Sequence, residues 1–116
     1  MSVALHAVTF DCADAASLAE FWSGVLEQPV GSGASEQFAM VGGAGEGGPA
    51  WMFSQVPEGK QVKNRVHPDL GSADLAAEAE RVIKLGATRI ADHEEGGTRW
   101  TTFADPEGNE FDIAQD

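Results

Sequence analysis

The sequence has few basic residues, a single cysteine and no long apolar run. Lysine and arginine together number 7, against 19 aspartates and glutamates, so the formal net charge is −12. A field of that sign repels phosphate backbones and anionic membrane surfaces, which argues against nucleic acid and lipid as partners. No stretch approaches the roughly 20 apolar residues that a membrane-spanning helix needs. We therefore expect neither a nucleic-acid-binding protein nor a membrane protein.

The scarcity of cysteine points to a compartment. Cys12 has no second cysteine with which to form an internal disulfide, as is typical of the reducing cytoplasm. The first ten residues lack the basic start and the long apolar stretch of a secretory signal. With 42% hydrophobic and 22% charged residues, the 116-residue chain has the composition of one globular domain with a buried core. We expect a cytoplasmic protein.

The first half of the chain predicts a strand, a helix and three short strands. The helix is capped by Asp14, carries apolar side chains at helical spacing and is predicted to end at Pro29. Its apolar stripe consists of Leu18, Phe21, Trp22, Val25 and Leu26. The strands are predicted at residues 3–11, 30–34, 37–41 and 50–56. Between the last two, Gly42 to Pro49 predicts a flexible hairpin or a pocket lid.

The second half repeats this order. A helix is predicted to begin near Ser72 or Asp74 and to end at Gly86. Its buried face is expected to hold Leu75, Ala79, Val82 and Ile83. The strands are predicted at residues 63–70, 88–92, 99–104 and 110–114, with Pro68 removing one ladder donor from the first of them. His93 is placed in a polar, solvated turn.

The repeat predicts an α+β fold of two βαβββ modules within a single domain, 1–116. Module one covers about residues 1–57 and module two about residues 62–116, as an internal duplication would give. Neither half is large enough to bury both faces of a four-stranded sheet alone. Its helix can cover one face of the sheet. The other faces, toward which Thr9, His67, Glu110 and Asp112 point, must meet another sheet or enclose a cavity.

A tight turn closes the second half at Asp105-Pro106-Glu107-Gly108-Asn109. Pro106 fixes φ at the second turn position, and Gly108 or Asn109 can take positive φ without strain. With this hairpin, the paired strand–Asp–helix openings and the stretch 63–67, the chain resembles the vicinal oxygen chelate superfamily. That group includes glyoxalase I, bleomycin-resistance, fosfomycin-resistance and extradiol dioxygenase proteins, and the chain is most similar to its compact glyoxalase-like domain branch. The resemblance implies two curved half-barrels with helices on the outer faces, usually assembled across a homodimer.

The resemblance also implies where metal ligands would lie. In metal-using members they come from the first strand of each half and from the last strand, sometimes with one more from the fourth strand. These positions hold Ala7, His67, Asp112 and Met52 here. Alanine cannot bind a metal, methionine is a soft and weak ligand, and a catalytic site needs three or more ligands. We therefore predict no cofactor, with a divalent metal at His67 and Asp112 as the alternative.

Two functions follow from these residues. The first is a binding module without metal, related in activity to bleomycin sequestration, that encloses a small aromatic or cationic molecule. The second is a lyase, isomerase or dioxygenase in which a divalent metal orients two vicinal oxygens. No catalytic residue is assigned, and whether the protein is an enzyme stays open. The side chains expected to bind the ligand are His67, Asp69, Trp51, Met52, Trp100, Glu110 and Asp112; for the two tryptophans, a place in the core is the alternative.

Overall fold

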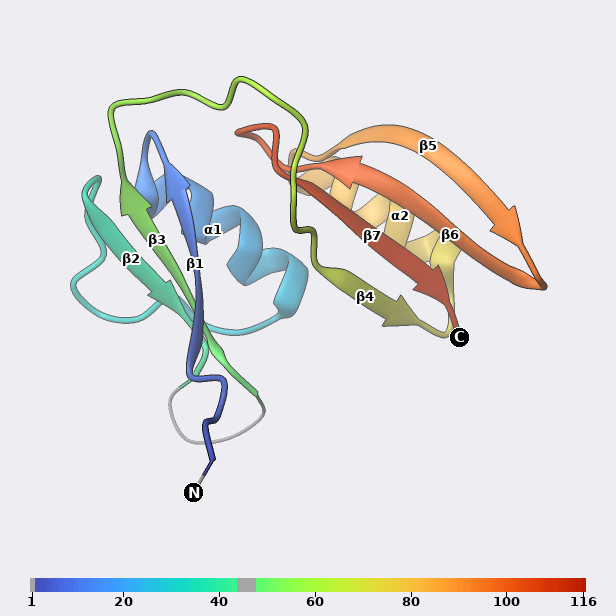
Figure 1. Ribbon diagram of the computed structural model, residues 1–116, viewed down its shortest axis with the longest axis horizontal. Coiled ribbons are helices and arrows are strands. Elements are labelled where there is room, and N and C mark those ends of the chain that lie inside the picture. Colours follow the sequence, from blue (N-terminus) through green and yellow to red (C-terminus); the bar gives the residue numbers. More distant parts are fainter. Residues whose placement is uncertain (1, 44–47) are drawn as a thin grey trace. The chain divides into compact units, whose positions relative to one another are not determined.

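The computed structural model describes residues 2–43 and 48–116, in two compact units, Met1–Gly59 and Lys60–Asp116 (Figure 1). The first unit contains β1 (Ala7–Cys12), α1 (Ala15–Leu26), β2 (Phe38–Val41) and β3 (Ala50–Gln55). The second contains β4 (Asp69–Ser72), α2 (Leu75–Leu85), β5 (Thr88–Glu95), β6 (Thr98–Ala104) and β7 (Glu110–Gln115). The expected α+β fold with two related modules is confirmed. Neither helix among these residues is long and apolar enough to cross a membrane.

Both helices begin at the predicted aspartates. Asp14 accepts a hydrogen bond from the Ser17 backbone N–H at 3.2 Å, and Asp74 accepts one from the Ala77 N–H at 3.1 Å. Each bond satisfies one of the backbone donors that the first turn of a helix leaves unpaired. α1 ends at Leu26, three residues before Pro29, because Glu27 turns the chain with a left-handed φ of 55°.

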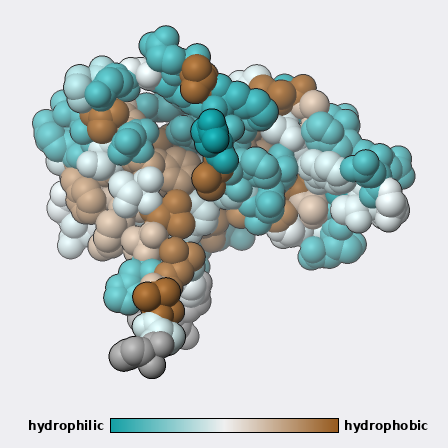
Figure 2. Space-filling view, viewed as in Figure 1, coloured by the Kyte–Doolittle hydropathy of each residue, from teal (hydrophilic) through white to brown (hydrophobic). Residues whose placement is uncertain are grey.

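Each sheet is mixed, and the three strands of the first sheet correspond to three of the four strands of the second. The first has the order β1-β3-β2 and the second β4-β7-β6-β5, with the first pair parallel in each. The side chains that face the helices form the cores. The largest fully buried ones are Trp22, Phe53, Phe103, Phe111, Leu18, Val41 and Val82. Polar residues predominate on the visible surface of the second unit (Figure 2).

Several predicted boundaries are wrong. Residues 30–34 form no strand, only a bridge from Val30 to Val41, because Gly33 takes a φ of 84° and the chain leaves the sheet. The strand predicted at 63–70 begins only at Asp69. Before it, the Asn64 side chain donates to the carbonyls of Val66 and Glu110, at 3.1 and 3.3 Å, in place of ladder bonds.

Two other expectations concern the buried face of α2 and the loop before β3. Ile83 was expected on the buried face of α2, but 43% of it is exposed, because it lies at the border of the apolar stripe. The hairpin or lid expected at residues 42–49 includes residues 44–47, which lie outside the described part of the chain.

An offset of 60 positions relates the two units residue by residue. It pairs the helix caps Asp14 and Asp74, and it pairs the glutamines that end β3 and β7. The Gln55 amide donates to the Ala13 carbonyl at 2.9 Å, and the Gln115 amide donates to the Ala73 carbonyl at 2.7 Å. The duplication therefore extends to individual hydrogen bonds between the last strand of each unit and the residue before its helix cap.

Replacing Asp74 with alanine should lower the free energy of unfolding by about 1 kcal/mol, because the Ala77 N–H loses its acceptor. Urea denaturation monitored by circular dichroism measures the loss. Asp74→Ser should recover most of it, since serine also caps helices. Glu80→Ala, on the exposed side of the same helix, is the control. Equal stability of Asp74→Ala and the unaltered protein would contradict the capping role.

Candidate functional site

The candidate site lies on the face of the second sheet that points away from α2. Phe103, Phe111 and Ile113 are buried against the helix side, so their strand neighbours point to the open side. The register places Asp69 of β4 beside Asp112 of β7, and Asp112 beside Thr102 of β6. Three adjacent strands thus bring polar side chains into one row.

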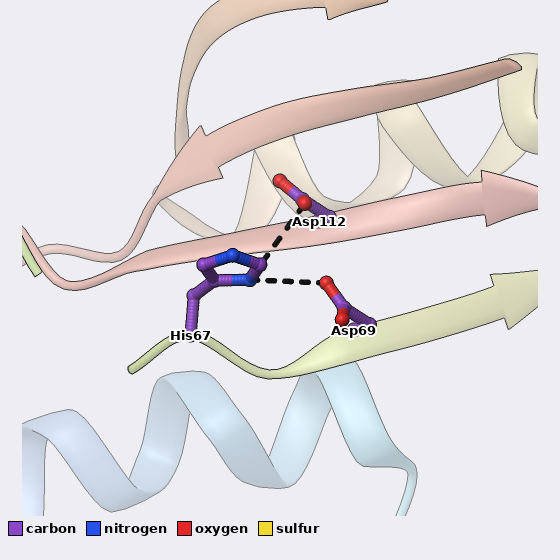
Figure 3. Close-up of side chains that lie close together, drawn as sticks. All are labelled: His67, Asp69 and Asp112. Atoms are coloured by element: carbon purple, nitrogen blue, oxygen red, sulfur yellow. Dashed lines mark ion pairs between the residues drawn. The ribbon is translucent and has the colours of Figure 1, made fainter. Parts of the chain in front are cut away.

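His67 and two carboxylates form the centre of this row (Figure 3). The His67 Nδ1 lies 3.0 Å from Asp69 Oδ1 and 3.7 Å from Asp112 Oδ2. The exposed fraction of the side chain is 45% for His67, 68% for Asp69 and 15% for Asp112, so the pair with Asp112 is the better shielded. His67 precedes β4, and the Pro68 carbonyl accepts from the Asp112 N–H at 3.0 Å, which ties this segment to β7.

The row continues through Thr102 to His93. The Thr102 hydroxyl donates to Asp112 Oδ1 at 2.6 Å, and His93 Nε2 lies 3.2 Å from the same hydroxyl oxygen. We call His67, Asp69, Asp112, Thr102 and His93 the polar chain. It crosses all four strands of the sheet.

The position of His93 corrects the prediction of a solvated turn. His93 lies within β5, which extends to Glu95, and its ring stacks on Trp100 with centroids 5.1 Å apart and planes at 19°. The turn comes three residues later, at Gly96 and Gly97, which both have positive φ. Two consecutive glycines between strands are a known hairpin signal, and they could have located the turn from the sequence.

Glu110 shares the open face but has another partner. Its carboxylate pairs with Lys63, and Asn64 donates to its backbone carbonyl. Glu110 therefore lies on the predicted face, but its charge is balanced by Lys63 and not by His67.

The predicted residues of the first unit lie on two different faces. Met52 pairs with Thr9 and Met40 on the side of the sheet opposite α1. Trp51 points toward α1, where its ring stacks on Trp22 at 5.3 Å. The structure thus places Trp51 with the core aromatics, the alternative that the sequence left open.

A further carboxylate in β5 belongs to a separate pair of contacts. Asp92 accepts from the Thr101 hydroxyl at 2.9 Å and from Arg89 at 2.7 Å. The Thr101 hydrogen bond and then the Arg89 guanidinium lower the pKa of Asp92. Asp92 and Thr101 are one position away from His93 and Thr102, so they point to the other side of the sheet.

His67, Asp69 and Asp112 are the residues that could hold a metal ion on this sheet face. One ligand atom each from His67, Asp69 and Asp112 lie within 4.8 Å of one another. Asp69 is a third donor that the ligand positions implied by the family did not include. An imidazole with two carboxylates is a donor set that divalent metals accept. The positions in the first unit that correspond to these three residues hold Ala7, Thr9 and Met52, which add no strong ligand.

Comparison with known proteins identifies the family. The profile of the glyoxalase-like domain family matches residues 7–114, and the chain belongs to this family. The chain is similar in structure to a glyoxalase/bleomycin resistance protein/dioxygenase family enzyme from Burkholderia phytofirmans PsJN, with a TM-score of 0.80 and 19% identity over 97% of this chain and 98% of that one. No curated protein sequence matches the chain.

Two further solved structures have names that state an activity. One is the fosfomycin resistance protein FosX from Mesorhizobium loti, with a TM-score of 0.74 and 18% identity over 100% of this chain and 93% of that one. The other is lactoylglutathione lyase from Agrobacterium tumefaciens, with a TM-score of 0.70 and 12% identity over 99% and 95% of the two chains. At these identities the likeness shows a shared fold alone, and the family assignment rests on the profile match.

Proposed function

We propose that this protein binds a small organic molecule on the open face of its second sheet, without a resident metal. The observation that carries the proposal is the polar chain, which joins two carboxylates and two histidines across one sheet face. The stacked rings of Trp100 and His93 provide a flat apolar surface at one end of it. Binding sites combine apolar surface with a few placed polar groups in this way.

The ligand that suits this face is aromatic or cationic. Asp69 and Asp112 carry negative charge, and no lysine or arginine pairs with either among the described residues. The net charge of −12 adds long-range attraction for a cation. We further propose that the protein works in the cytoplasm as a homodimer, since the outer strands of its open sheets have edges that a second copy can cover.

The second candidate function is a metal-dependent lyase, isomerase or dioxygenase. The three donors within 4.8 Å favour it, as do the names of FosX and lactoylglutathione lyase among the similar structures. A bound divalent metal would supply Lewis-acid stabilisation of charge on a substrate oxygen. His67, Asp69 and Asp112 would hold it, and the His67 Nδ1 would have to give up its proton to bind.

Thermal unfolding with and without metal separates the two functions. We expect aromatic amines or amidines to raise the melting temperature of EDTA-treated protein, while zinc or manganese chloride leaves it unchanged. A ligand at 100 times its Kd stabilises a protein by about 2.7 kcal/mol, which gives a readily measured shift. The shift should disappear in His67→Ala and persist in the matched control His6→Ala, because His6 lies before β1 in the first unit.

The outcome that would overturn the metal-free proposal is specific. It is a rise in melting temperature with zinc or manganese that is lost in His67→Ala and kept in His6→Ala. Elemental analysis of the purified protein gives an independent result, since stoichiometric metal would favour the enzyme.

A further inference from the structure

We propose that the polar chain has one fixed arrangement of protons, and that this arrangement leaves only hydrogen-bond acceptors free for a ligand. The inference rests on the proposed function and deepens it, because it selects the class of ligand. It follows from counting the protons that each group of the chain can donate. The contacts of two residues determine where the protons lie: those of Thr102 and those of His67.

At Thr102, the hydroxyl has a single proton. An ionised carboxylate can only accept, so the 2.6 Å contact commits the Thr102 proton to Asp112 Oδ1. The hydroxyl oxygen must then accept from His93 Nε2, which lies 3.2 Å away. His93 therefore carries its proton on Nε2, and its Nδ1 has a free lone pair when the ring is neutral.

At His67, two carboxylate oxygens near the same ring nitrogen favour one tautomer of the neutral ring. The Nδ1 lies 3.0 Å from Asp69 Oδ1 and 3.7 Å from Asp112 Oδ2, and both oxygens can only accept. The proton of the neutral ring therefore sits on Nδ1, and Nε2 has the free lone pair. Among residues 2–43 and 48–116, neither His67 Nε2 nor His93 Nδ1 has a hydrogen-bond partner.

While both rings are neutral, the free polar atoms of the chain are therefore all acceptors. They are the outer nitrogens of both histidines and the carboxylate oxygens of Asp69 and Asp112 that remain available. A ligand that only accepts hydrogen bonds, such as a carboxylate, finds no donor in the chain and meets two negative charges. An organic cation with several N–H groups, of the amidinium or ammonium class, satisfies these acceptors. Charge-assisted hydrogen bonds of this kind are roughly twice as strong as neutral ones.

Nuclear magnetic resonance tests the proton arrangement without any ligand. Long-range ¹H–¹⁵N correlation spectra distinguish the two neutral tautomers of each histidine at the high-pH end of a titration. We expect Nδ1–H for His67 and Nε2–H for His93. In Thr102→Val, which removes the hydroxyl at nearly constant volume, His93 should lose its tautomer preference. The control Thr9→Val makes the same change on the open face of the first sheet and should leave the His93 signals unchanged.

Binding of three flat probes of similar shape tests the ligand class. Benzamidine carries a positive charge and donates from both nitrogens, benzamide is neutral, and benzoate only accepts. Titrations followed by chemical shift should rank them benzamidine, benzamide, benzoate in falling affinity. Asp112→Asn, which removes one of the two negative charges at nearly constant volume, should weaken benzamidine about tenfold, as loss of a hydrogen bond to a charged group does. Thr9→Val should not weaken it.

Each outcome decides a separate claim. The opposite tautomer at either histidine overturns the proton arrangement, whatever binds. The expected tautomers with benzoate bound as tightly as benzamidine overturn the ligand class alone. The expected tautomers with no benzamidine binding also overturn the ligand class, and they count against the binding function itself while the proton arrangement stands.

Discussion

Replacing Trp22 with alanine should lower the free energy of unfolding by about 3–5 kcal/mol, the range for large-to-small changes in a core. The Trp22 side chain is fully buried. Its ring stacks on Trp51 at 5.3 Å and meets the rings of Phe10 and Phe21 edge-on, each at 5.5 Å. Removing it leaves a cavity between α1 and its sheet and deletes these aromatic contacts. Urea denaturation followed by circular dichroism measures the change.

Leu26→Ala is the control for this substitution. It lies on the same helix, but its side chain is only half-buried, so we expect a loss well below that of Trp22→Ala. A loss under about 1 kcal/mol for Trp22→Ala would show that the packing of α1 on β1 and β3 is not the main support of the first unit.

Replacing Asp105 with alanine should lower the free energy of unfolding by about 2–4 kcal/mol, because several donors lose their acceptor together. Asp105 is only 3% exposed and begins the turn before β7. Its Oδ1 accepts from the backbone N–H groups of Glu107 and Asn109, both at 2.9 Å, and its Oδ2 accepts from the Asn109 side chain at 2.9 Å. Denaturation of the variant in urea gives the value.

Asp105→Asn separates the loss of the acceptor for the backbone N–H groups from the loss of the acceptor for the Asn109 side chain. Asparagine keeps one side-chain oxygen for the two backbone donors and loses the second oxygen, so an intermediate loss is expected. If Asp105→Ala were as stable as the unaltered protein, the turn would be held by its backbone bonds alone. These run from the Asp105 N–H to the Asn109 carbonyl at 2.8 Å and from the Gly108 N–H to the Asp105 carbonyl at 2.9 Å.

The sequence predicted the elements whose signals are local. Both helix caps and the Gly86 end of α2 are confirmed, and so is the turn of the closing hairpin, where Gly108 has a φ of 89°. These signals depend on a few neighbouring residues. The strand predicted at 63–70 was wrong because its outcome depends on a distant contact: Asn64 bonds to the backbone of Glu110, 46 positions away.

The candidate site was less predictable than the fold. Alternation in β7 correctly put Glu110 and Asp112 on one face, and the repeat drew attention to His67. The row of Asp69, Asp112 and Thr102 requires the strand order β4-β7-β6, which places residues 43 and 10 positions apart side by side. Alternation within one strand carries no information about that order. His93 was missed for the same reason, since its partner Thr102 lies on the neighbouring strand.

The 60-position offset between the units has a consequence for how this chain evolved. After a gene segment is duplicated, selection needs to maintain a chemical task in one copy only. The second copy holds His67, Asp69 and Asp112 where the first holds Ala7, Thr9 and Met52. The helix caps are the same in both copies, and so are the hydrogen bonds that Gln55 and Gln115 donate. The residues that cap the helices and join the last strand to the helix start are thus shared by both units, whereas the residues on the open sheet faces differ. The hydrogen bonds common to both units mark what the fold of one module requires, and the residues of the open sheet faces are where the two modules differ.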